Sequence, residues 1–84
     1  MSPAAAMVAA ALAGCAPHDT MTEALERSGY AIGAQGIVAG GALLIEIFVD
    51  DAGNWVAVLS RASDELACIK AAGSDWAVQI GSPA

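Results

Sequence analysis

Two cysteines, Cys15 and Cys68, constrain this chain more than any other feature of its sequence. They belong to no CxxC motif, and with a single histidine in the chain, cysteine and histidine alone cannot form a tetrahedral zinc site within one chain. Three alternatives remain: a disulfide, lipidation of one thiol, or two unrelated buried thiols. A disulfide would close a loop of more than fifty residues. It would contribute roughly 4 kcal/mol in the chain-entropy treatment, comparable with the net stability of so small a domain.

The chain begins with an apolar segment over residues 1–14, which carries no charged side chain and is too short to span a bilayer. Such a segment is typical of a secretory signal, and Ala11-Leu12-Ala13 fits the small-residue pattern of a cleavage site. We therefore expect a signal-like segment at 1–14 and a periplasmic or secreted domain after it. The basic residue usual in a signal is missing. A native start upstream of Met1, or an alanine-rich helix, therefore stays open.

The residues before Cys15 also resemble a lipobox. The stretch Leu-Ala-Gly-Cys at 12–15 is similar to the site at which bacterial lipoproteins are cleaved and acylated on the cysteine. Lipidation and a disulfide compete for one sulfur atom, because a thiol that carries a lipid cannot pair with Cys68. The alternative to a freely exported protein is therefore a lipoprotein anchored in the envelope through Cys15.

Composition indicates a folded domain and excludes one class of function. Hydrophobic residues make up 57% of the 84 residues and charged residues 14%, unlike a disordered chain. Nine acidic residues against three basic ones give a net charge of -6. A nucleic-acid-binding protein needs clustered lysine or arginine to displace counterions, and here the basic residues are scattered. We expect no nucleic-acid partner and no membrane span, while an unknown protein partner stays open.

The pattern after residue 17 predicts one short helix over residues 21–28. Thr20 and Glu23 have the spacing of a capping box, and Gly29 suits the position just after a helix end. One face of this helix would bury apolar side chains at helical spacing, namely Met21, Ala24 and Leu25.

From residue 30 the periodicity changes to that of strands. Apolar runs separated by Gly, Asp and Asn occupy residues 30–38, 42–49, 55–60 and 66–71, and a last extended stretch occupies 76–80. This order predicts an α+β fold, one short N-terminal helix packed on a three- to four-stranded antiparallel meander. We expect a single domain over 15–80 and a frayed tail at 81–84. The large core side chains would be Tyr30, Phe48, Trp55 and Trp76.

Several short motifs lie in the same order along residues 15–76. They are an early cysteine followed by Ala-Pro, a short helix, the strand I-E-I-F-V, the turn D-x-x-G-N-W, the strand L-A-C-I and the segment A-A-G-S-D-W. Together they resemble a family of small exported proteobacterial proteins without assigned function, which has an early Cys, an ELF-x-G-x-W hairpin and a C-x-V-A-x-G-x-x-W segment. The resemblance implies export and a disulfide between Cys15 and Cys68, and it implies no activity.

We predict no catalytic residue. His18 is the only imidazole, and a Cys15–His18 dyad would lie in the first turn of the exported chain, where nothing holds its geometry, so we expect a solvated histidine. Glu46 lies within an apolar strand and could serve as a buried general acid. We expect instead that Glu46 faces solvent or pairs with Lys70 or Arg61 across the sheet.

Two further groups of residues have simple structural explanations. Asp50, Asp51 and Asn54 lack the twelfth-position glutamate of a calcium-binding EF-hand loop, so they predict a hairpin turn. The glycines form no phosphate-binding loop. Trp55 and Trp76 could stack on a ligand, but packing explains them better.

We therefore predict no metal site and no cofactor. The sequence favours a non-catalytic protein of the cell envelope that serves as a binding or structural module and is not an enzyme.

Overall fold

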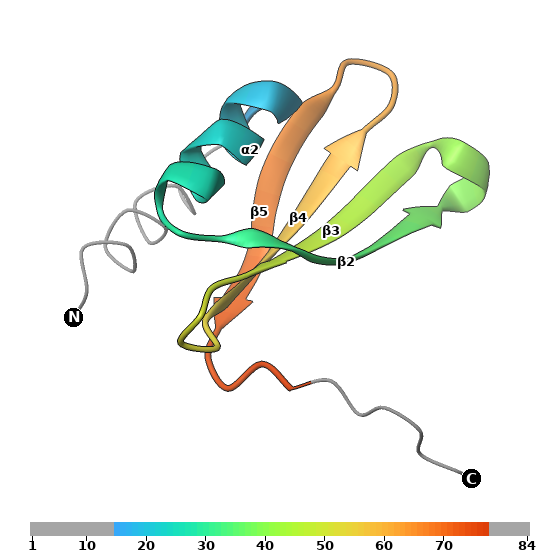
Figure 1. Cartoon of the computed structure of the whole chain (residues 1–84). Helices are drawn as coiled ribbons and strands as arrows, with labels where there is room; N and C mark the ends of the chain where they lie inside the picture. The colour runs from blue at the N-terminus through green and yellow to red at the C-terminus, as the bar shows by residue number, and fades with distance from the viewer. Residues whose placement is uncertain (1–14, 78–84) are drawn as a thin grey trace, which may run out of the picture.

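The structure of the protein is a computed structural model that describes residues 15–77 (Figure 1). Its elements are β1 (Cys15–Pro17), α2 (His18–Arg27), β2 (Ala31–Val38), the 3-10 turn η1 (Ala39–Gly41), β3 (Leu43–Val49), β4 (Trp55–Arg61) and β5 (Leu66–Gly73). The signal-like segment 1–14, the tail 81–84 and the end of the extended stretch 76–80 lie outside the described residues.

The five strands form one antiparallel sheet in the order β1-β5-β4-β3-β2. The predicted α+β fold with a three- to four-stranded meander is therefore wrong, because the described residues form mainly a five-stranded sheet, with one short helix. The unexpected strand is β1, which has only three residues and whose Cys15 stands directly opposite Cys68 on β5. A strand this short carries no periodicity of its own, so its partner determines it.

The helix α2 begins earlier than its capping pattern predicts. Its N-cap is Pro17, which makes no side-chain capping bond, so the predicted capping box at Thr20 and Glu23 is wrong. Proline suits this position because it has no N–H to leave unpaired. The end of the helix agrees with the sequence, since Gly29 follows it with φ of 92°.

The core lies between α2 and one face of the sheet, which we call the covered face. Its buried side chains are Met21, Leu25, Tyr30, Phe48, Val56, Val58, Ala67 and Ile69. Of the helix residues expected to be buried, Ala24 is exposed. Of the four predicted aromatic core residues, Tyr30 and Phe48 are confirmed, whereas Trp55 and Trp76 are half-buried and lie outside this core.

The opposite face of the sheet is also apolar, and α2, the one helix of the described residues, does not cover it. Strand register places on this uncovered face Val38, Leu43, Ile45, Ile47, Val49, Trp55, Ala57 and Leu59, with Arg61 opposite Leu43 at one end. Ile45 is 37% exposed there. Figure 1 shows α2 packed beside β5 on one side of the sheet only. The sheet therefore has one buried face and one that is partly exposed, where Val38 and Ile45 are exposed and Ala57 is buried.

Candidate functional site

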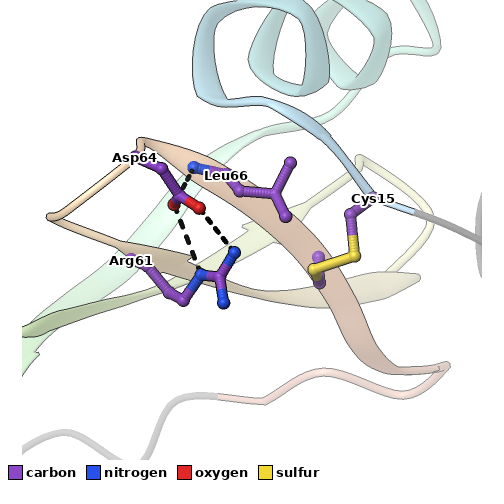
Figure 2. Close-up of a disulfide and its surroundings, with 5 residues drawn as sticks. Cys15, Arg61, Asp64 and Leu66 are labelled. Carbon is purple, nitrogen blue, oxygen red and sulfur yellow. Dashed lines mark hydrogen bonds and ion pairs between the residues drawn. A yellow bond between two sulfur atoms is a disulfide. The ribbon is translucent and has the colours of Figure 1, made fainter.

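A disulfide joins Cys15 and Cys68, whose Cα atoms lie 4.3 Å apart in directly opposed positions of β1 and β5 (Figure 2). This is a close cross-strand pair, the arrangement in which side chains of antiparallel neighbours approach most nearly. A disulfide in a small domain fits an oxidising compartment. It also fixes the first strand, and with it the beginning of α2.

The disulfide positions His18 because only two residues separate Cys15 from it. The His18 backbone N–H donates to the Glu65 carbonyl oxygen at 2.9 Å, which ties the start of α2 to the loop between β4 and β5. The first turn of the helix is thus held from both sides, by a covalent bond through β1 and by this hydrogen bond. The imidazole therefore occupies a defined position at the end of the sheet.

The imidazole of His18 pairs with Glu46, a residue 28 positions away on β3. His18 Nε2 lies 2.7 Å from Glu46 Oε1, and Glu46 is only 6% exposed. The predicted solvated histidine is therefore wrong, and so is the expected pairing of Glu46 with Lys70 or Arg61. A buried carboxylate is costly unless it is hydrogen-bonded, and His18 supplies that bond.

The pair changes the titration of the histidine. The hydrogen bond that the imidazole donates to Glu46 raises the pKa of His18 above 6.5, against the opposing effect of partial burial, and the nearby Asp19 carboxylate adds to the rise. Asp19 Oδ1 lies 3.7 Å from His18 Nδ1 and is fully exposed. The cationic form of His18 is thus favoured by two carboxylates, one buried and one in solvent.

A cleft of about 570 Å³ opens beside this pair, at the end of the sheet where α2 begins. Ile37, Leu43 and Leu44 form its apolar wall, and His18 and Ser60 also line it. Ser60 is 5% exposed, and no described residue lies within hydrogen-bonding distance of its Oγ. Sequence analysis did not identify Ser60, because a serine at the end of a strand has no pattern that distinguishes it.

The β4–β5 loop forms the rim of the cleft and is held by its own contacts. Arg61 Nη2 donates to Asp64 Oδ2 at 2.5 Å, and the Leu66 N–H donates to Asp64 Oδ1 at 3.1 Å, as Figure 2 shows. The backbone donor of Leu66, followed by the arginine, lowers the pKa of Asp64. Glu65 adopts φ of 55°, a left-handed conformation that glutamate rarely takes. Such backbone strain concentrates at functional loops.

The Asp50 loop is a hairpin turn, as the sequence predicts. Asp50 accepts hydrogen bonds from the backbone N–H groups of Ala52 and Asn54 and from the Asn54 side-chain amide, at 2.9 to 3.0 Å. The Asn54 side chain is the largest cause of the lowered pKa of Asp50. Both carboxylate oxygens of Asp50 are therefore hydrogen-bonded within the turn. Within residues 15–77, no three His, Cys, Asp or Glu side chains gather in a metal-binding group.

The two tryptophans meet at the opposite end of the sheet, away from the cleft. The centroids of Trp55 and Trp76 lie 6.2 Å apart with their planes at 52°, and the Trp55 indole N–H donates to the Ser74 carbonyl at 3.2 Å. Trp55 opposes Val49 in the strand register and so belongs to the uncovered face. The tryptophan pair thus borders that face and packs on no part of the core.

Comparison of the chain with known protein families, with curated proteins and with solved structures finds no match. In the described part of the chain, no helix is long and apolar enough to cross a membrane.

Proposed function

We propose that this chain is an exported, non-catalytic binding module of the bacterial envelope, periplasmic or secreted, which binds a protein partner through the uncovered face of its sheet. The observation that supports a binding role is the apolar surface of the uncovered face. Val38 and Ile45 are exposed on it, with Ile47, Val49 and Leu59 half-buried beside them. Contiguous apolar surface that is exposed in this way marks interaction sites. The resemblance to a family of small exported proteins supports the same compartment.

The disulfide supports export without a lipid anchor. Cys15 Sγ is bonded to Cys68 Sγ, and a cysteine acylated on sulfur cannot form that bond. The lipoprotein alternative therefore requires a domain without this crosslink. The oxidising periplasm or medium is where such a bond forms and persists.

The arrangement of the polar residues supports a non-catalytic role. Ser60, His18 and Glu46 are of the types that make up a nucleophilic triad, but a triad needs the base within hydrogen-bonding distance of the nucleophile. Here His18 Nε2 is bonded to Glu46, and Ser60 Oγ has no partner among the described residues. Cys15 is held in the disulfide, so it offers no thiolate.

The net charge of the chain indicates what kind of protein binds the uncovered face. A second copy of this chain would bring another net charge of -6 against the first, and that repulsion opposes self-association. Asp51 and Asp75 are exposed at the tryptophan end of the sheet. The partner we propose is therefore a different protein, with an apolar patch bordered by lysine or arginine.

A designed amphipathic helix of leucine and lysine, used as a probe of that chemistry, tests the proposal. We expect it to bind with micromolar affinity and to shift the methyl NMR signals of Ile45, Ile47 and Leu59. The same helix with glutamate in place of lysine should bind much more weakly, because the charges then repel. Equal binding of both helices, or an oligomeric chain in sedimentation that buries Ile45 against a second copy, contradicts the proposal.

Two isoleucines provide a matched pair of variants. Ile45 on the uncovered face is 37% exposed, and Ile32 is 49% exposed but opposes Phe48, so it lies on the side of the sheet that carries α2. Ile45→Ser should weaken binding of the leucine-lysine helix about tenfold, the loss expected of one central apolar contact. Ile32→Ser should leave it unchanged. If both variants bind equally well, the uncovered face is not the interaction surface.

A further inference from the structure

The two edges of the sheet are protected to different degrees. The β5 edge is covered by β1 at Leu66, Ala67 and Cys68, and farther along it carries Lys70 at a shift in the strand register. The other edge is β2, the last strand of the sheet on the side away from β5 (Figure 1). This strand contains no charged residue and no proline. Charges, prolines and covering elements usually prevent an edge strand from pairing with another chain, so β2 is the less protected edge.

The second half of β2 is regular and exposed. A register shift lies between Ile32 and Ala34, and from Ala34 to Val38 each residue directly opposes a residue of β3. All of these residues except Gly36 are exposed, Ile37 by 69%. In an antiparallel edge strand, every second residue points its N–H and C=O groups away from the sheet. No described strand pairs with these groups, and an extended chain is the partner that fits them.

The fold of the free protein does not require a glycine at position 36. Gly36 is not among the glycines with positive φ, and a Cβ atom there would lie 3.6 Å from Ile45 Cγ2, an ordinary contact. Gly33 differs, because a Cβ atom there would come within 3.0 Å of Val49 Cγ2. Glycine in the interior of a strand weakens it and often marks a place where another backbone or a ligand approaches closely. Gly36 therefore leaves room that no described residue fills.

The same sheet shows what fills such room beside a glycine. Gly73 on β5 directly opposes Trp55 on β4, and the indole lies so close that a Cβ atom at Gly73 would come within 2.9 Å of it. Gly36 opposes Ile45 and so lies on the same face of the sheet as Gly73, but no ring of the described residues covers it. Aromatic side chains opposite a glycine on the neighbouring strand stabilise strand pairing.

We propose that β2 binds an extended segment of another protein as a further antiparallel strand beside Ala34 to Val38, with an aromatic side chain of that segment directly opposite Gly36. Main-chain hydrogen bonds to the edge supply affinity, and the aromatic ring over Gly36 supplies specificity. The proposal concerns backbone pairing at the edge of the sheet, so it does not depend on the partner proposed for the uncovered face.

No free segment of this chain supplies the aromatic side chain. The strands β1, β2 and β5, which form the edges of the sheet, contain none. Of the four aromatic residues of the chain, Tyr30 and Phe48 lie in the core, and Trp55 and Trp76 contact each other. A second copy would also bring another net charge of -6 against the first. The added strand therefore comes from a different protein.

A synthetic peptide of about seven residues, the length of an ordinary strand, tests the proposal. It has phenylalanine at its centre, valine and threonine on either side, and a lysine at each end. We expect saturable amide NMR shifts at Ala34, Gln35 and Ile37, and none at Lys70 or Ala72 on the other edge. The same peptide with alanine at its centre should bind severalfold more weakly. Shifts at the β5 edge without shifts in β2 would overturn the proposal.

Methylation of the peptide backbone separates strand pairing from mere apolar contact. Two isomeric peptides carry N-methyl groups on alternate amides, one on odd positions and the other on even positions. Only one of these sets faces β2, because alternate amides of a strand point to opposite sides. One isomer should bind as the parent does, and the other should lose at least about tenfold in affinity, since its hydrogen bonds to β2 are removed. Equal binding of the two isomers would overturn the proposal.

Gly36→Ala separates a glycine kept for a partner from one kept for the fold. Because the free protein has room for the added Cβ atom, the melting temperature should stay unchanged or rise. The phenylalanine peptide should bind severalfold more weakly, while the alanine peptide should bind as before. A marked fall in the melting temperature would mean that the fold needs this glycine. That result, or an unchanged preference for phenylalanine, would overturn the proposal.

Two lysine substitutions provide a matched pair at the two edges. Ile37→Lys places a charge on the exposed β2 edge and should weaken binding of the phenylalanine peptide severalfold. Ala72→Lys adds the same charge at an exposed position of β5 and should leave binding unchanged. Equal losses in the two variants would mean that total charge controls binding, and they would overturn the proposal.

Hydrogen exchange of the chain without peptide tests whether the β2 edge is free. Its outward amides should exchange rapidly in a chain that sediments as a monomer, and addition of the phenylalanine peptide should slow them. Slow exchange in a dimer would mean that a second copy covers the edge. Slow exchange in the monomer would mean that another part of the chain covers it. Either result would overturn the proposal.

Discussion

The more polar face of the sheet is the buried one, and the more apolar face is the more exposed one. On the covered face, β3 presents Leu44, Glu46 and Phe48, and on the uncovered face it presents Leu43, Ile45, Ile47 and Val49. The face that carries a carboxylate is the one beneath α2, while the fully apolar row stays open. The disulfide joins β1 to β5 at the edge of the sheet, and α2 follows β1 directly in the chain.

The comparison teaches that burial here follows the position of the helix and not the hydrophobicity of the strand. Glu46 is tolerated in the covered face because His18, at the start of the same helix, provides its hydrogen-bonding partner. The apolar row of the uncovered face is then available to another protein.

Removal of the Cys15–Cys68 disulfide should have the largest effect on the stability of this two-faced sheet. The double variant Cys15→Ser/Cys68→Ser should lose about 4 kcal/mol of unfolding free energy, because the crosslink closes a loop of 53 residues in the unfolded chain. Urea unfolding measures the loss. The wild type under reducing conditions is the matched comparison and should behave alike. A loss below about 1 kcal/mol would mean that the disulfide does not hold α2 in place.

A pair of truncations tests which face is the core. Phe48→Ala on the covered face should cost about 3 to 4 kcal/mol, because it leaves a cavity under α2. Ile45→Ala on the uncovered face should cost less than about 1 kcal/mol, since its side chain is already in contact with water. Thermal or urea unfolding gives both values. Equal losses would indicate that the uncovered face is buried in solution.

The His18–Glu46 pair lies on the covered face and should make the unfolding free energy depend on pH. The pKa of His18 is raised above 6.5 in the folded protein, so the pair's contribution is full below pH 6.5 and is lost as pH rises through the folded pKa. Glu46→Gln should lower the unfolding free energy by about 1.5 kcal/mol near pH 6, with a smaller effect near pH 9.

NMR titration of the imidazole checks the same pair directly. In Glu46→Gln the pKa of His18 should fall toward its ordinary value, because the largest cause of its rise is removed. Glu23→Gln changes an exposed carboxylate on the same helix, paired with Arg27, and should leave the His18 pKa where it is. An unchanged pKa in Glu46→Gln would mean that the two side chains are not in contact.

The smallest effect is expected at the border of the uncovered face. A Cβ atom at Gly73 would come within 2.9 Å of the Trp55 indole, which packs across it. Gly73→Ala should displace that ring at a cost of about 1 kcal/mol, and the tryptophan fluorescence should shift because the ring leaves Ser74 and Trp76. An unchanged spectrum and stability would show that the indole does not rest on Gly73.

Much of the sheet can be predicted from the sequence, because its central strands have strong local patterns. The runs at 42–49 and 55–60 alternate between two faces and are separated by the Asp50 turn, and the structure places β3 and β4 there. The first strand could not be predicted in this way. It exists because Cys15 meets Cys68, a contact between distant parts of the chain.

The candidate site was harder to predict than the fold. His18 and Glu46 are brought together only when α2 packs on the sheet, and nothing in the spacing of the two residues indicates a contact. One signal was present, since an acidic residue inside an apolar strand needs a partner, and the chain has one imidazole. Ser60 gave no signal at all, because a serine at the end of a strand has no pattern that distinguishes it.

The intact mass of the protein isolated from its native cells, alkylated before and after reduction, tests the central claim most directly. The account predicts a chain from the envelope or the medium that lacks the leader and carries no lipid. No thiol should react before reduction, and both should react afterwards. A cytosolic chain that retains Met1, with both cysteines alkylated without reduction, would contradict it.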